Sequence, residues 1–186
     1  MPFDLLTTPA TWDLLSKTGQ AYFDALMEHL AKVLGVSLAF TVESVAPSGQ
    51  RVCPVASWGG VGFRGGLCYD TRDTPCERLG QGQNGIYPDR LAERFPADPW
   101  VAKSGMRSYV GVPLLGAEGM PLGHLGVLDH RPMKDPQAVA ATLAAFAPRC
   151  AAELRRAHQD RGLERLRRAR HDQGLERRVG HHAWVL

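Results

Sequence analysis

Apolar residues recur at helical spacing near the start of the chain. Within residues 11–34 they lie three or four positions apart, which predicts an amphipathic helix that ends at Gly35. Gly19 lies inside this segment and is expected to separate a short first piece from the main helix, residues 20–34. The chain therefore opens with helical structure that has one apolar side available for packing.

Two segments that follow have the residue types of β-strands. Residues 37–45 and 51–58 are rich in β-branched and aromatic side chains, and the Pro-Ser-Gly sequence at 47–49 is typical of a turn. These segments predict a hairpin. After a glycine-rich loop, residues 63–69 are expected to form a third strand.

The centre of the chain contains two stronger strand patterns, residues 108–115 and 122–130, joined by a turn at 116–119. A Pro- and Gly-rich excursion with many aromatic residues precedes them. Its expected elements are a short helix at 71–80 with a capping box of Thr74 and Glu77, an extended piece at 86–87 and a short helix at 88–95. Irregular backbone with aromatic and polar side chains is typical of binding regions, so we expect the function to lie here.

The last helix is expected to begin at Asp135, as a capping residue, with Pro136 in its first turn. Pro148 lies inside this helix and removes a backbone hydrogen bond, so we expect a kink or a break at 144–148. The order of elements predicts an α+β domain with one central antiparallel sheet. The terminal helices are expected to pack on one face of the sheet, and the excursion on the other.

Composition is that of a globular protein. With 186 residues and 44% hydrophobic residues, the chain has the length of one domain plus extensions. The N-terminus lacks the basic flank and apolar core of a signal peptide, and no run of about 18 apolar residues occurs, so we expect a cytoplasmic protein without a membrane span. The four cysteines are widely spaced without a C-x-x-C pair, which predicts reduced thiols and no metal site.

Positive charge is concentrated near the C-terminus. The net charge is +3, and residues 153–179 contain nine Arg against five acidic residues, whereas the rest of the chain is nearly neutral. A solvated helix surface explains this segment more simply than nucleic-acid binding, which we do not expect.

Several short motifs, in order along the chain, resemble those of the bacterial GAF domain family. They are TPCE at 74–77, YPD at 87–89, FPAD at 95–98, SYVGVP at 108–113 and LGHLGV at 122–127. The resemblance covers residues 20–157 and leaves 1–19 as an N-terminal extension and 158–186 as an Arg-rich helical connector or tail. It implies a GAF-like, PAS-related fold: a six-stranded antiparallel sheet with helices on one face and a loop-covered pocket on the other. It also implies a sensory role and frequent dimerisation through the terminal helices.

The candidate pocket consists of aromatic and polar residues in or near the excursion. Rings provide stacking, Arg binds carboxylate or phosphate, and Asp binds amines. The candidate residues are Trp58, Cys76, Tyr87, Asp89, Asp98, Trp100, Arg107, Tyr109 and His124. For each of them a structural role is the alternative: the aromatic residues and His124 as core, Cys76 as an incidental thiol, and the charged residues as helix caps.

The sequence assigns neither catalytic residues nor a cofactor. It has no G-x-S-x-G, H-E-x-x-H or G-x-x-x-x-G-K motif. Bilin-binding GAF domains carry a Cys followed directly by His, whereas Glu77 follows Cys76 here. A thiol enzyme similar to the free methionine sulfoxide reductases, using Cys76 or Cys68, is a further alternative.

We therefore expect a small-molecule-sensing regulatory domain of a bacterial signal-transduction protein, and not an enzyme. It would act through a helix-mediated homodimer on an effector domain or partner protein. The identity of the ligand stays open. A ligand-free dimerisation and interaction module is the main alternative.

Overall fold

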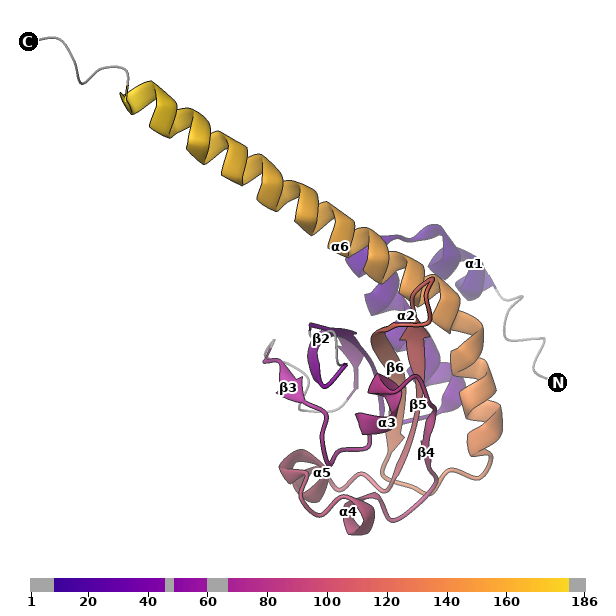
Figure 1. The fold of residues 1–186 in the computed structure, drawn as a ribbon. Helices are drawn as coiled ribbons and strands as arrows, with labels where there is room; N and C mark the ends of the chain where they lie inside the picture. Colours follow the sequence, from indigo (N-terminus) through magenta and orange to yellow (C-terminus); the bar gives the residue numbers. More distant parts are fainter. Residues whose placement is uncertain (1–8, 46–48, 60–66, 181–186) are drawn as a thin grey trace, which may run out of the picture.

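A six-stranded sheet is the centre of the fold (Figure 1). The computed structural model describes residues 9–45, 49–59 and 67–180, with side chains between residues 13 and 165 of these ranges. The strands are β1 (Leu38–Ser44), β2 (Arg51–Trp58), β3 (Tyr69–Asp70), β4 (Gly85–Tyr87), β5 (Ser108–Leu115) and β6 (Pro121–Asp129). They pair in the order β3-β2-β1-β6-β5-β4, and every neighbouring pair is antiparallel. The predicted α+β fold with one antiparallel sheet is confirmed.

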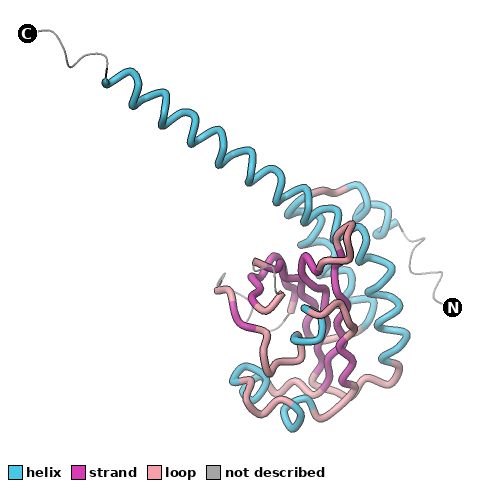
Figure 2. The backbone as a smooth tube through the Cα atoms, viewed as in Figure 1, coloured by secondary structure: helices cyan, strands magenta, loops and turns pink. Residues whose placement is uncertain are grey.

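Helices lie on both sides of this sheet. They are α1 (Pro9–Ser16), α2 (Gly19–Leu34), α3 (Glu77–Gly80), α4 (Leu91–Arg94), α5 (Pro99–Ser104) and α6 (Pro136–Gly180). Helices α2 and α6 pack on one side, whereas α3 lies on the other, with α4 and α5 near one end of the sheet (Figures 1 and 2). The predicted division, with the terminal helices on one face and the excursion on the other, is therefore correct.

The central strands are apolar on both sides because each side faces a core. On the helix face, Ala39 of β1 and Leu125 of β6 pack with residues of α2 and α6. On the loop face, Phe40 of β1 and Leu128 of β6 pack with residues of α3, α4 and α5. Burial on both faces explains why these strands have continuous apolar runs rather than strict alternation.

Most predicted boundaries agree with the structure. Strands β2 and β5 have the predicted bounds, Gly19 begins α2, and Gly35 adopts the left-handed conformation that ends α2. In the excursion the helices are shorter than predicted. Residues 47–48 of the predicted turn and 63–66 of the predicted third strand lie outside the described residues.

The predicted capping box at α3 does not form. The hydroxyl of Thr74 accepts from the N–H of Cys76, and the carboxylate of Glu77 accepts from the N–H of Asp73. A capping box would use the N–H groups of Glu77 and Thr74, so each side chain bonds to the N–H one residue before the expected one. The reason is that the chain makes a turn through 71–76 before the helix begins at Glu77.

The prediction that all four cysteines are reduced thiols is wrong. Cys53 of β2 and Cys68, which directly precedes β3, form a disulfide. The antiparallel β2–β3 ladder brings the two residues opposite each other, with Cα atoms 4.1 Å apart. The sequence did not reveal this pair because it depends on the register in which the short third strand pairs with β2, and the sequence does not specify that register. Cys76 and Cys150 are free and buried.

The sequence predicted a kink or a break at 144–148. Helix α6 is continuous through Pro148, so the break does not occur, but the helix changes direction along its length (Figure 1). Leu143 and Phe146 before the proline, and Cys150 and Leu154 after it, all pack into the helix-face core, which holds both halves of this segment against the sheet. Beyond the body, α6 continues as a single extended helix in a different direction (Figure 1).

A carboxylate of α6 caps the beginning of α2. Thr18 makes no side-chain cap, and instead Glu153 accepts from the N–H of Gly19 at 2.9 Å. Glu153 is 5% exposed and also pairs with Arg149 at 2.8 Å. A buried carboxylate is stable at this position because the first turn of a helix carries unpaired N–H groups and a positive dipole end. The two terminal helices are thus joined by a polar contact as well as by the core.

Replacement of Glu153 by Ala is expected to lower the free energy of unfolding by about 1–3 kcal/mol, since it leaves the N–H of Gly19 and the guanidinium of Arg149 without this partner. Urea unfolding followed by circular dichroism measures the change. Glu164→Ala, at an exposed position of the same helix, is the matched control. Equal losses for the two variants would contradict the assigned cap.

Candidate functional site

The loop face carries a cluster of aromatic rings around Tyr109, which is 1% exposed. Phe40 of β1 lies with its ring centroid 6.3 Å from that of Tyr109, and Tyr87 of β4 stacks on Tyr109 at 6.1 Å. Phe95 packs edge-on against Tyr87 at 4.8 Å. These four rings cover the middle of the sheet from β1 to β4, and we call them the Tyr109 cluster.

Three glycines on adjacent strands make room for the Tyr109 ring. Gly85 of β4 pairs with Gly111 of β5, which pairs with Gly126 of β6. A Cβ atom on Gly85 would lie 3.0 Å from Cε1 of Tyr109, one on Gly111 would overlap its phenol oxygen, and one on Gly126 would lie 2.8 Å from Phe40. The ring therefore lies directly on the backbone of the sheet, a position that any larger residue in this row would block.

The thiol of Cys76 lies between two phenols beside this cluster. Its Sγ is 3.5 Å from Oη of Tyr109 and 3.7 Å from Oη of Tyr69, which reaches it from β3. Burial raises the pKa of the Cys76 thiol to about 11, and the nearby charge of Asp98 acts in the same direction. The thiol is therefore protonated at neutral pH, which is the opposite of what a catalytic or metal-binding cysteine requires.

His124 of β6 has a buried ring nitrogen, Nε2, that finds no hydrogen-bond partner among the described residues. The residue is 2% exposed and packs edge-on against Phe40, with ring centroids 5.8 Å apart. Burial lowers the pKa of His124 to about 3, so the ring is neutral. A buried polar atom without a partner is uncommon in native proteins and calls for an explanation.

The predicted charged residues do not enter the cluster. Arg107 binds the carboxylate of Asp89 through two hydrogen bonds, each 3.0 Å long, at the surface. Asp98 caps α5 by accepting from the N–H groups of Trp100 and Val101. Asp98 thus has the helix-capping role that the sequence left open, whereas Arg107 and Asp89 form an ion pair that it did not predict.

Five of the nine candidate residues come together on the loop face. These are Cys76, Tyr87, Trp100, Tyr109 and His124. Trp58 pairs with Ala39, a helix-face residue, and so lies on the other side of the sheet. The sequence reasoning missed Phe40, Tyr69 and the glycine row. Period-two alternation in β1, where Leu38, Phe40 and Val42 share a face, could have identified Phe40.

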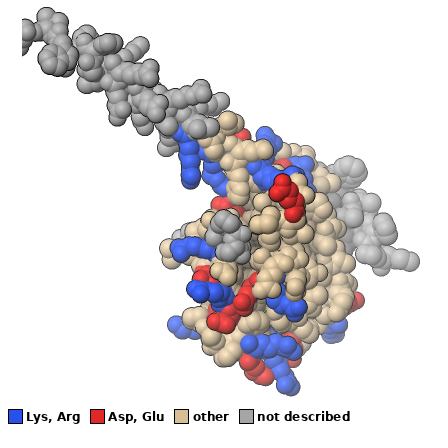
Figure 3. Space-filling view, in the orientation of Figure 1, with Lys and Arg blue, Asp and Glu red and all other residues tan. Residues whose placement is uncertain are grey.

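Charged side chains are interspersed over the surface that Figure 3 displays. Acidic and basic groups alternate there, and this face has no large area of one sign of the kind that binds nucleic acid. Among the described residues, no three His, Cys, Asp or Glu side chains gather as a metal site would need. None of the helices in these residues has an apolar stretch long enough to cross a membrane.

The family model of the GAF domain matches residues 19–154. The chain belongs to the GAF domain family. GAF domains form a sensory and regulatory family, and the loop-face cluster occupies the side of the sheet on which the resemblance predicted a GAF pocket. No curated protein matches the sequence.

Several solved structures, two of them GAF domains, have the same fold at low sequence identity. The GAF domain of an Acinetobacter phosphoenolpyruvate-protein phosphotransferase has a TM-score of 0.71 and 16% identity, covering 87% of this chain and 98% of that one. The corresponding Coxiella burnetii domain has a TM-score of 0.69 and 14% identity, with 87% and 96% covered. The chromophore-binding domain of a Stigmatella aurantiaca bacteriophytochrome has a TM-score of 0.57 and 14% identity, with 78% and 60% covered.

The depressed pKa of His124 predicts a specific loss of stability in acid. The unfolded chain takes up this proton near pH 6.5, whereas the folded chain does so only near pH 3, so stability falls as the pH drops through this window. Between pH 7 and pH 4.5 the wild type should lose about 2 kcal/mol more than His124→Leu. Urea unfolding at both pH values measures the difference. Identical pH dependence of the two proteins would contradict a buried, neutral His124.

Proposed function

We propose that this GAF domain senses a small molecule on its loop face, as part of a bacterial signal-transduction protein in the cytoplasm. The observation that carries the proposal is the buried Nε2 of His124, which has no partner among the described residues. Leaving such a group unpaired costs about 1–3 kcal/mol, and a ligand that supplies the missing hydrogen bond would recover this free energy. The sensory character of the family supports the same conclusion.

The surroundings of His124 favour an uncharged, flat ligand. The cluster provides aromatic faces, two phenols and a protonated thiol, whereas Arg107, Asp89 and Asp98 are engaged with each other or with a helix end. Aromatic rings bind planar apolar groups, and hydrogen bonds to the few hydroxyl groups fix the orientation of the bound ligand. Arg107, the candidate cation for a phosphate group, is engaged with Asp89.

Strand β6 offers a short path from this site to the output helix. His124 is on the loop face, while its neighbours Leu125 and Val127 pack in the helix-face core together with Leu143 and Phe146 of α6. A ligand that moves β6 would therefore act on α6 through direct contacts, by favouring one of two arrangements of the helix.

Dimerisation through α6 is the second part of the proposal. The helix continues beyond the body of the domain (Figure 1), and residues 159–165, the last part of it with described side chains, are exposed. Most helices derive their stability from packing of an apolar side, so a partner helix is the natural support for this segment. Leu163 lies on it with 53% of its surface exposed.

One observation favours a ligand-free scaffold as the second candidate function. The protein's own rings and the Cys76 thiol already fill the loop face, with Tyr109 lying on the glycine row. In that case the domain would only dimerise and bind partners. The thiol-enzyme alternative has less support, because Cys76 is buried with a raised pKa and Cys68 is in a disulfide.

A thermal-shift screen of nucleotides, heterocyclic metabolites and linear tetrapyrroles tests ligand binding; the chromophore-binding relative motivates the last class. A true ligand at 100 times its dissociation constant should add about 2.7 kcal/mol of stability, or roughly 5–10 °C in midpoint. The shift should disappear in His124→Leu and persist in His130→Gln, a histidine on the surface. A screen without any hit would favour the ligand-free scaffold.

Analytical ultracentrifugation tests the dimer. Leu163→Glu should raise the dimer dissociation constant about tenfold or more, because it removes the burial of one leucine side chain. Gln159→Glu, which adds the same charge at an exposed position of α6, is the matched control and should have little effect. A wild-type protein that stays monomeric at high concentration would rule out the helix-mediated mechanism.

A further inference from the structure

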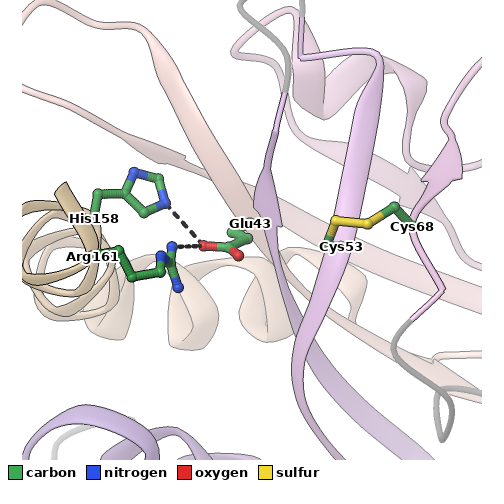
Figure 4. Close-up of a disulfide and its surroundings, with 5 residues drawn as sticks. All are labelled: Glu43, Cys53, Cys68, His158 and Arg161. Atoms are coloured by element: carbon green, nitrogen blue, oxygen red, sulfur yellow. Dashed lines mark hydrogen bonds and ion pairs between the residues drawn. A yellow bond between two sulfur atoms is a disulfide. The ribbon is translucent and has the colours of Figure 1, made fainter. Parts of the chain in front are cut away.

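The disulfide fastens the edge strand of the sheet. Strand β3 pairs with β2 through only two residue pairs, Arg51 with Asp70 and Val52 with Tyr69. The Cys53–Cys68 bond is the covalent link between these two strands (Figure 4). Both cysteines are half-buried, unlike the buried thiols Cys76 and Cys150.

A second contact beside the disulfide anchors helix α6. Glu43 of β1 accepts a hydrogen bond from Nε2 of His158 at 2.9 Å and binds the guanidinium of Arg161 with the same carboxylate oxygen (Figure 4). The Glu43 side chain is only 16% exposed. A carboxylate with so little water contact depends on its partners, so this contact holds the point at which α6 leaves the body.

The two features are neighbours in the sheet. In the β1–β2 ladder Glu43 lies directly opposite Cys53, so their side chains project from the same face. Figure 4 displays the disulfide and the Glu43 contact on adjacent strands. The backbone that positions the Glu43 carboxylate is therefore hydrogen-bonded to the backbone that carries the disulfide.

We propose that Cys53–Cys68 is a reversible redox site whose state controls how firmly Glu43 holds α6. A dithiol reductant attacks one sulfur, the Cys53–Cys68 bond breaks and a mixed disulfide forms; the second thiol of the reductant then resolves it. Two electrons and two protons pass to Cys53 and Cys68, and the reductant leaves as a disulfide. Exchange with an oxidised dithiol reverses the step.

Reduction frees β3 from its covalent link and leaves it with two residue pairs. Strand β2 is then no longer held by β3 at the position opposite Glu43. The contact of Glu43 with His158 and Arg161, which anchors α6, is weakened as a result. Disulfides in a reducing compartment are typically transient or redox-sensing, which agrees with this role and with the proposed cytoplasmic location. Reduction and reoxidation of the disulfide do not require the proposed ligand, and only their use as a signal rests on the proposed function, in which α6 is the output element.

Hydrogen exchange of the full chain, with and without dithiothreitol, tests the proposal. Reduction should accelerate exchange of residues 67–75 by up to about 100-fold, the factor expected when a constraint that closes a loop of about 15 residues is lost. Exchange of residues 154–163 of α6 should also accelerate, by severalfold. Oxidised glutathione should restore both segments. Native-state alkylation should label Cys53 and Cys68 only after reduction.

Three variants separate the steps. The double variant Cys53→Ser, Cys68→Ser should exchange like the reduced protein without any reductant, while Cys150→Ser should not. Glu43→Gln should accelerate exchange in α6 but leave residues 67–75 protected. In Glu43→Gln, reduction should have no further effect on α6, because both changes act on the same contact.

Three results would overturn the proposal. The first is a disulfide that dithiothreitol does not reduce in the native protein. The second is unchanged exchange of α6 after reduction, and the third is an acceleration that simply adds to that of Glu43→Gln. Reduction of the wild type needs no variant to fold, so the test does not depend on the double variant. None of these results bears on ligand binding, which the His124→Leu comparison tests separately.

Discussion

The close approach of the Tyr109 ring to the sheet is the constraint on which the loop face depends. The ring lies against the backbone of Gly85, Gly111 and Gly126. It can do so because these glycines have no side chains that would occupy the same space. From this position its phenol reaches Cys76, and its ring contacts Phe40 and Tyr87. Residues of the short helices α3, α4 and α5 pack against these rings. This packing explains how an excursion with so little regular structure still forms a buried core.

Local pattern was enough to predict the sheet and its two covered faces. Strands β2 and β5 have the expected bounds because β-branched and aromatic residues stop abruptly at turn residues on each side. At Pro148 one of the two predicted outcomes, a break in the helix, does not occur. The penalty for an interior proline is real, but apolar residues on both sides of it bury into the same core, and tertiary packing prevails over local preference.

The candidate site was predicted as a region but not as a set of contacts. Aromatic residues such as Tyr87 and Tyr109 converge because burial drives them together, and composition alone indicates that. Ion pairs between distant residues carry no comparable signal: nothing in the sequence shows that Arg107 would bind Asp89 rather than a ligand. The same holds for Cys53 with Cys68 and for Glu43 with His158, since each pair depends on the register and crossing of separate elements.

Strand β3 connects the two faces because consecutive residues in a strand point in opposite directions. Cys68 is bound to Cys53, which lies opposite Glu43, whereas the next residue, Tyr69, reaches Cys76 on the loop face. Any displacement of β3 must therefore change both environments at once. A ligand that prefers one position of Tyr69 would also favour one redox state of the disulfide, and by reciprocity the redox state would change the affinity for that ligand.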